Sequence, residues 1–179
     1  MSYLIDANAL ITPYQTYYAF DLVPQFWDFL AEQVANGNII IIDKIYDEIA
    51  ANKDKKKTSD ALQLWIETLS KYKKSVRTKE ILVSYSYVVN HINDSGKYTD
   101  SAVRLWFDEK HADPWLVATA KAENHKIITF ETSKGATSKG QSWSVVKIPN
   151  VCEDLDVECV GLFNVLHKLG LERKNRIPA

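Results

Sequence analysis

Cysteine is scarce in this 179-residue sequence, and its scarcity excludes two kinds of fold. Cys152 and Cys159 are the only two cysteines, so they provide neither a disulfide framework nor a four-ligand zinc set. The sequence also lacks an apolar stretch near the roughly 20 residues needed to cross a bilayer. Its opening, Met1 to Asp6, has no basic region followed by a long apolar segment, so we expect no signal peptide. These absences favour a cytoplasmic protein that does not contact a membrane.

The length and composition are those of an ordinary globular domain. A chain of 179 residues has room for one normal hydrophobic core. Its 46% hydrophobic and 25% charged content is typical of soluble proteins. Because no internal repeat divides the sequence, we predict a single domain over residues 1–171 and a loose tail over residues 172–179.

The net charge of −1 hides an asymmetry along the chain. Residues 53–79 contain nine basic and three acidic side chains, so this segment has a charge of +6 and the remainder −7. A basic segment beside an acidic body could bind a polyanion while the acids bind metal. A solvated loop that keeps the protein soluble explains the same run equally well.

Hydrophobic periodicity predicts strands and helices that alternate at both ends of the chain. Short apolar runs predict buried strands at residues 2–5, 39–42 and 126–130, and alternation predicts another at 143–148. Helical spacing is found at residues 21–36, 44–52, 113–123 and 159–169. Between the two ends lie three further helices, the first capped by Thr58 or Ser59 and the last started by Thr99.

This order of elements predicts an α/β protein. The expected architecture is a three-layer α/β/α sandwich with a mostly parallel sheet of four or five strands. A helical, basic insertion over about residues 53–110 interrupts the alternation of strands and helices.

Four acidic residues lie where parallel-strand folds place functional groups. Each flanks an apolar run or opens a helix: Asp6, Glu48, Asp113 and Glu131. Side chains beyond the carboxyl ends of parallel strands converge on one crevice. Carboxylates gathered there repel one another unless a cation lies between them. The pattern therefore predicts a divalent metal site and chemistry on phosphate.

Each acid also has a purely structural explanation. Asp6 could simply start a turn, and Asp113, followed by proline, has the sequence of a helix N-cap. By helical phase Glu48 lies beside the buried positions Ile45 and Ile49, where a lone charge is costly. Capping and metal ligation are compatible, because a carboxylate has several lone pairs.

Polar residues accompany the acids at both strand ends. Asn8 could orient Asp6 or contact phosphate, and Thr129 could hold a phosphate, a metal-bound water or Glu131 itself. Glu131 could equally be a polar strand end. His111 is the histidine nearest the acids, but a lone histidine before a helix is usually structural or exposed. The five tryptophans lie at core phases, so we expect them to pack rather than to stack on bases.

Together these segments resemble the PIN domain, the metal-dependent ribonuclease fold of many VapC-type toxins. PIN domains open with an apolar strand and Asp-x-Asn, as Asp6 and Asn8 do. Their second acid lies early in the helix after the second strand, as Glu48 does. Their third opens a helix of small residues, as Asp113 does here.

The end of a later strand completes the resemblance. A Thr-x-Asp motif of PIN domains corresponds to Thr129-Phe130-Glu131, with Glu where Asp is commoner, and this departure concerns the second metal position more than the fold. The opening residues and the segment 112–115 further resemble a PIN-like subfamily still classed by an uncharacterised domain.

The resemblance implies a cofactor and a reaction. Mg²⁺ or Mn²⁺ would be held by Asp6 and Asp113, while Glu48 and Glu131 bind a second metal or position the metal-bound water. Asn8 would support this set. The water would attack a phosphodiester of single-stranded RNA in line, leaving 5′-phosphate and 3′-hydroxyl ends. The residues expected to bind the RNA backbone are Lys53, Lys55, Lys56, Lys57, Lys73 and Lys74.

The resemblance also implies a biological role. It favours a toxin restrained by an antitoxin protein, and PIN toxins often form homodimers. One alternative is an RNA-processing or defence nuclease without an antitoxin, and another is a non-catalytic module that binds RNA or protein. The presence of all four acids argues against the module. A haloacid-dehalogenase-like phosphatase would need Asp at position 8, which is Asn.

Overall fold

Four short parallel strands form the centre of the protein in a computed structural model that describes residues 2–51, 60–133 and 142–171. They are β1 (Tyr3–Ile5), β2 (Ile39–Ile40), β3 (Lys126–Ile128) and β4 (Cys159–Val160), in the order β2-β1-β3-β4. In the register, Leu4 of β1 is the partner of both Ile40 and Ile127. All four strands therefore end at the same edge of the sheet.

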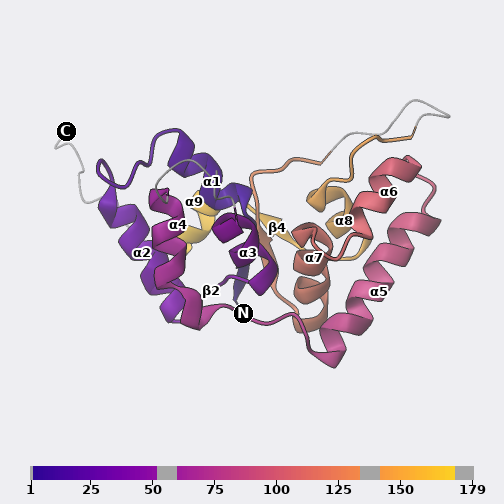
Figure 1. The fold of residues 1–179 in the computed structure, drawn as a ribbon, viewed down its shortest axis with the longest axis horizontal. Coiled ribbons are helices and arrows are strands. Elements are labelled where there is room, and N and C mark those ends of the chain that lie inside the picture. The colour runs from indigo at the N-terminus through magenta and orange to yellow at the C-terminus, as the bar shows by residue number, and fades with distance from the viewer. Residues whose placement is uncertain (1, 52–59, 134–141, 172–179) are drawn as a thin grey trace.

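Helices cover both faces of this sheet, as the predicted α/β/α sandwich requires (Figure 1). The first half of the chain contributes α1 (Asn8–Gln15), α2 (Pro24–Ala35), α3 (Asp43–Ala51), α4 (Ala61–Thr68) and the 3₁₀ turn η1 (Ser70–Tyr72). The second half contributes α5 (Lys79–Asp94), α6 (Asp100–Trp106), α7 (Ala112–Glu123), α8 (Ile148–Asp154) and α9 (Leu162–Lys168). In Figure 1, α2, α4 and α9 lie to the left of the strands, and α5 to α8 lie to the right.

The inserted block between α3 and α7 consists of α4, η1, α5 and α6 in its described part. Thr99 caps α6 as predicted, accepting a 3.4 Å hydrogen bond from the Ala102 N–H. The cap of α4 is Asp60, which forms a reciprocal capping box with Gln63. The prediction of Thr58 or Ser59 as that cap was therefore wrong, because a better capping pair follows them; both lie outside the described residues.

The predicted strand at residues 143–148 is not one. Trp143 makes a single isolated bridge with Tyr98, and α8 begins at Ile148. Pro149 explains the difference, because proline fits the first turn of a helix, where the missing N–H needs no partner. The apolar alternation before it thus leads into a helix rather than a strand.

The fourth strand lies inside a segment predicted to be helical. Residues 159–169 begin with β4, turn at Gly161 and only then form α9. A two-residue strand leaves almost no periodic signal of its own, so its residues were assigned to the longer helical pattern of α9. The helix α1 was not predicted either, and it contains Pro13 in its interior.

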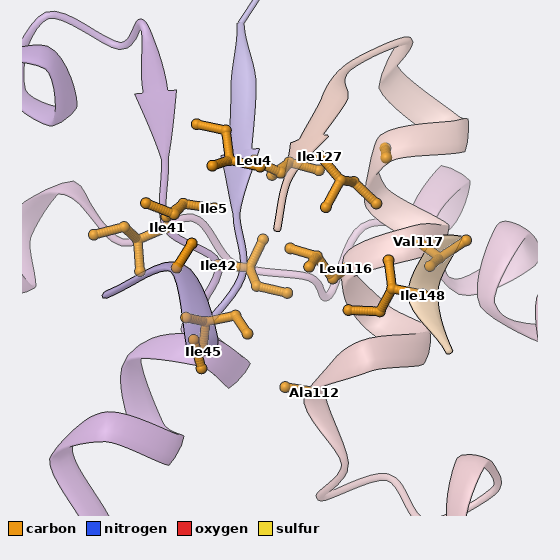
Figure 2. Close-up of a cluster of buried hydrophobic side chains, with 14 of the residues drawn as sticks. Leu4, Ile5, Ile41, Ile42, Ile45, Ala112, Leu116, Val117, Ile127 and Ile148 are labelled. Carbon is orange, nitrogen blue, oxygen red and sulfur yellow. The ribbon is translucent and has the colours of Figure 1, made fainter. Parts of the chain in front are cut away.

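Apolar side chains from the strands and from α7 form one core (Figure 2). Leu4 and Ile5 of β1, Ile127 of β3, and Leu116 and Val117 of α7 all belong to this core, and all five are fully buried. Burial of this kind contributes about 25 cal/mol for each Å² of apolar surface removed from water. The core fixes β1 and α7 against each other, and so fixes the residues that follow β1 and open α7.

Trp27, Trp106 and Trp115 are fully buried, and Trp65 and Trp143 pack against the core. The expectation that the tryptophans pack is therefore confirmed. None of the helices in the described ranges is long and apolar enough to cross a membrane.

Candidate metal centre

Asp6 lies directly after β1, at the carboxyl edge of the sheet. Its N–H donates to the Ile128 carbonyl at 3.0 Å, which continues the pairing of β1 with β3. The residue is only 4% exposed. Its Oδ2 accepts a 2.8 Å hydrogen bond from the Thr129 hydroxyl. A carboxylate is thus held in a buried position at the point where two central strands end.

Asn8 and Thr129 hold the end of β3 in place. The Asn8 Oδ1 accepts a 3.1 Å hydrogen bond from the Phe130 N–H and lies 3.4 Å from the Thr129 hydroxyl. The Glu131 N–H donates to the Thr129 hydroxyl at 3.0 Å. The structure therefore brings Thr129 to Asp6, whereas the carbonyl oxygen of the Asn8 side chain is engaged with the chain after β3.

Both carboxylate oxygens of Glu131 already have partners. Lys147 donates to Oε1 at 2.5 Å, and the Ile148 N–H donates to Oε2 at 2.9 Å. The role of Lys147 was not predicted from the sequence. One feature of the sequence could have indicated it: Lys147 is a lone lysine within an apolar run, just before the Ile-Pro start of α8. This position places the lysine beside a helix N-terminus.

Asp113 is in the first turn of α7 but does not cap it. The N-cap position belongs to His111, whose side chain makes no capping hydrogen bond. The Nε2 of His111 lies 3.2 Å from the Asp113 Oδ2. The alternative that Asp113 is simply an N-cap is therefore wrong: the N-cap lies two residues earlier, at His111, and the carboxylate contacts this histidine instead.

His111 is half-buried and responds to the surrounding acids. Burial alone lowers the pKa of its imidazole, but the hydrogen bond and charge of Asp113, together with Glu48 and Asp108, raise the pKa overall. A lone histidine before a helix was expected to be structural or exposed, so its contact with Asp113 was not predicted.

Glu48, on α3, is exposed as a whole residue rather than packed beside Ile45 and Ile49. Even so, partial burial of its carboxylate raises its pKa, the charge of Asp113 raises it further, and His111 lowers it. Glu48 therefore lies within electrostatic reach of Asp113 on the solvent side of the centre.

Asp6 lies within electrostatic reach of the other three predicted acids. Burial is the largest cause that raises the pKa of Asp6 to about 7, followed by the charge of Asp113. The hydrogen bond from Thr129 lowers the pKa, and the charges of Glu131 and Glu48 raise it further. The charges of Asp113, Glu131 and Glu48 thus all reach Asp6, and these four residues are named here the acid cluster.

The donor set of the acid cluster fits a hard divalent cation. Carboxylate oxygens are the preferred ligands of Mg²⁺ and Mn²⁺, and a cation would relieve the repulsion that raises the pKa of Asp6. In the described part of the chain, no three His, Cys, Asp or Glu side chains already stand at ligand spacing. Mg²⁺ keeps several waters and needs only one or two direct carboxylates, which Asp6 and Asp113 can supply.

A groove adjoins the acid cluster between α3 and the chain before α7. It encloses ≈ 510 Å³, and both Glu48 and His111 line it. Lys44 and Lys110 lie along the same groove. Glu48 therefore has open space in front of it, in which a substrate could lie.

The basic residues predicted to bind RNA are only partly described. Lys53, Lys55, Lys56 and Lys57 lie outside the described residues. The Lys73 ammonium lies 4.5 Å from the centre of the Tyr46 ring. Lys74 forms a 2.8 Å ion pair with Glu123, which ends α7, whereas Asp113 lies in its first turn. Since a helix rises 1.5 Å per residue, about 15 Å of helix separates that ion pair from Asp113.

Comparison with known proteins gives one match. Residues 3–172 match the family described as a domain of unknown function, DUF4411. No curated protein and no solved structure matches the chain.

Proposed function

We propose that this chain, which belongs to the DUF4411 family, is a metal-dependent endoribonuclease that cleaves single-stranded RNA. The observation that carries the proposal is the acid cluster, in which a buried Asp6 has its pKa raised to about 7 by burial and by Asp113. A protein that gathers carboxylates in this way is stabilised by a cation among them. A divalent cation held by carboxylates is a common device for phosphodiester cleavage.

The choice of RNA as the substrate is supported by the likeness of the sequence to PIN domains. The likeness rests on the order and context of four residues, Asp6, Glu48, Asp113 and Glu131. A parallel α/β sheet whose carboxyl edge carries Asp6 and the end of β3 is consistent with it.

In the proposed reaction, Asp6 and Asp113 would hold Mg²⁺ or Mn²⁺, and the bound cation would activate water and offset the negative charge of the transition state. Thr129 keeps the Asp6 carboxylate oriented and favours its ionised form. His111 orients Asp113 through their 3.2 Å contact. Glu48, which faces the groove, positions the attacking water and accepts its proton.

In this scheme Glu131 binds metal only when its carboxylate is free of its present hydrogen-bond donors. Its two oxygens accept hydrogen bonds from Lys147 and from the Ile148 N–H. We therefore assign one metal position to Asp6 and Asp113, and a second position to Glu131 only when Lys147 releases it.

The test is cleavage of a labelled single-stranded RNA pool by the purified chain, with Mg²⁺ or Mn²⁺ and with EDTA. Asp6→Asn and Asp113→Asn should each abolish metal-dependent cutting, whereas Asp28→Asn, an exposed acid on α2, should cut like the parent. If either site variant cuts RNA like the parent, the site assignment is wrong. No cutting, together with no metal-induced rise in melting temperature, would favour a non-catalytic binding module.

The same likeness supports a toxin role in the cytoplasm, with a partner antitoxin that blocks the acid cluster. Induced expression of the parent should then stop cell growth, and expression of the Asp6→Asn variant should not. Cleavage in vitro without growth arrest would instead favour an RNA-processing or defence nuclease that has no antitoxin.

A further inference from the structure

A row of four aromatic side chains leads away from the acid cluster. It begins at Phe130, whose N–H is held by Asn8 next to Thr129. The ring centroid of Phe130 lies 6.2 Å from that of Phe163, which lies 5.5 Å from that of Tyr18. Tyr18 in turn lies 4.5 Å from Phe26. These four residues, Phe130, Phe163, Tyr18 and Phe26, are named here the aromatic row.

The aromatic row starts at the same sheet edge as Asp6. The Thr129 N–H donates to the Val160 carbonyl at 3.2 Å, so β3 and β4 end side by side. Phe163 lies in the first turn of α9, which begins two residues after β4. Phe130 and Phe163 are 37% and 38% exposed, which leaves part of each ring open to solvent beside the cluster.

The other end of the aromatic row forms the wall of a pocket of ≈ 430 Å³. Tyr18, Phe26 and Phe163 supply its aromatic surface, and Gln25 and His167 supply polar groups. This volume lies within the range of small-ligand sites, which combine an apolar lining with a few polar groups that fix orientation. The side chains of Gln25 and His167 both carry hydrogen-bond donors and acceptors, which could read the edge of a planar base.

We propose that the aromatic row binds nucleobases of the RNA strand on one side of the cleaved phosphodiester, with one base in the pocket. The inference deepens the proposed function and rests on it. A strand held by its phosphate at the acid cluster would bring its neighbouring base to Phe130, the nearest ring of the row. Single-stranded nucleic acid is commonly bound by stacking successive bases on aromatic side chains.

The shape of the site favours a base over a protein helix. A docked helix needs a long apolar groove that accepts side chains spaced three and four residues apart. The aromatic row offers instead tilted rings that end in one open pocket with polar groups. Aromatic stacking tolerates every base, because each base has a π-face.

The experiment is a binding measurement in EDTA, so that neither cleavage nor a metal-held phosphate contributes and the aromatic row is measured by itself. A short fluorescent single-stranded RNA of mixed sequence and an abasic ribose-phosphate strand of equal length are titrated with the full chain. Phe163→Ala should weaken binding of the RNA about tenfold, which is ~1.4 kcal/mol, and leave binding of the abasic strand unchanged. Phe163→Leu keeps apolar volume without a ring and should show the same loss, which separates stacking from misfolding.

Phe107→Ala is the matched control, since Phe107 is 45% exposed at the end of α6 and is outside the aromatic row. Equal RNA affinity of the Phe163→Ala variant and the parent would overturn the proposal, as would an equal loss on the abasic strand. If RNA affinity depends on Phe163 but the chain cuts no RNA, the role of the aromatic row is supported and the nuclease is refuted. If the Phe163→Ala variant has the metal-dependent cutting and the RNA affinity of the parent, the role of the aromatic row is refuted and the nuclease is not.

Discussion

The hydroxyl of Thr129 donates a 2.8 Å hydrogen bond to the carboxylate of Asp6, although 123 residues separate the two in the chain. The pairing of β1 with β3 places them together, and both are buried. This hydrogen bond lowers the pKa of Asp6, whereas burial and the charges of Asp113, Glu131 and Glu48 raise it. Thr129 is therefore the neighbour that keeps Asp6 closer to its ionised, metal-binding form.

Replacing Thr129 by valine should shift the pH dependence of the proposed cleavage. Without the donated hydrogen bond the pKa of Asp6 rises further above its usual range, so a larger fraction is protonated at neutral pH. We expect about a tenfold loss of cleavage at pH 7 and a profile displaced to higher pH. The variant should also lose about 1–3 kcal/mol of stability, because buried polar groups lose a partner.

Two variants separate this effect from simple destabilisation. Thr129→Ser retains the hydroxyl and should behave like the parent. Thr119→Val removes the buried 2.8 Å hydrogen bond from Thr119 to the Trp115 carbonyl within α7. It should lower the melting temperature without moving the pH profile. A displaced profile in Thr119→Val, or an unmoved one in Thr129→Val, would contradict the role given to Thr129.

The raised pKa of Asp6 predicts how the metal-free protein responds to pH. In the unfolded chain an aspartate ionises near 3.9, whereas in the native protein Asp6 keeps its proton up to about pH 7. Between these values the native state binds more protons, so stability falls as pH rises, by up to ~4 kcal/mol in total. His111, whose pKa is also raised, adds a loss of the same sign above pH 6.5.

Urea unfolding in EDTA between pH 4 and pH 8 measures this dependence. Asp6→Asn should unfold at higher urea than the parent at pH 8 and should show a flatter pH dependence. Asp28→Asn, exposed on α2, serves as the control. A parent and an Asp6→Asn variant with the same slope would show that Asp6 does not carry the pKa shift.

The parts of the fold that could be predicted are those with a long or strong sequence pattern. Ile39 and Ile40 lie in a run of four isoleucines, and α7 has many small and apolar residues. The two-residue strand β4 could not be found, because it spans only one alternation period and is followed closely by the helical pattern of α9. The stretch before Pro149 alternates like a strand, yet among the described residues it pairs only through the isolated bridge of Trp143 with Tyr98.

The candidate site was predictable to a similar extent. Asp6 and Glu131 were found because a polar residue directly after a buried strand is conspicuous in the sequence. The contacts of Glu131 with Lys147 and of Asp113 with His111 were not found. Both depend on where a helix begins, α7 for Asp113 and α8 for Lys147, and periodicity does not locate a helix start to the residue.

Leu116 provides a test of the core beneath the acid cluster. It is fully buried on α7, where it faces the strands, and Figure 2 shows it between Ile42 and Val117. Leu116→Ala should cost about 2–5 kcal/mol of unfolding free energy, since a cavity remains where the side chain packed. Leu64→Ala, at an exposed position on α4, should change stability by less than about 0.5 kcal/mol. Similar values for the two variants would contradict the packing of α7 against the sheet.

Lys147 should compete with metal for the carboxylate of Glu131. Its ammonium donates to Glu131 Oε1 and places a positive charge beside the acid cluster, which repels a divalent cation. Lys147→Met should therefore tighten Mn²⁺ binding about three- to tenfold, measured by calorimetry, and should cost only about 1 kcal/mol of stability because the pair is partly exposed.

Lys126→Met is the matched control for that measurement, since it breaks a similar 2.5 Å ion pair, with Glu158, where β3 begins. It should leave Mn²⁺ affinity unchanged. If Lys147→Met instead weakens Mn²⁺ binding, then the ion pair presents Glu131 to the metal rather than withholding it. If Mn²⁺ affinity stays the same in both variants, Glu131 is not a metal ligand, and the site is completed by Asp6 and Asp113 alone.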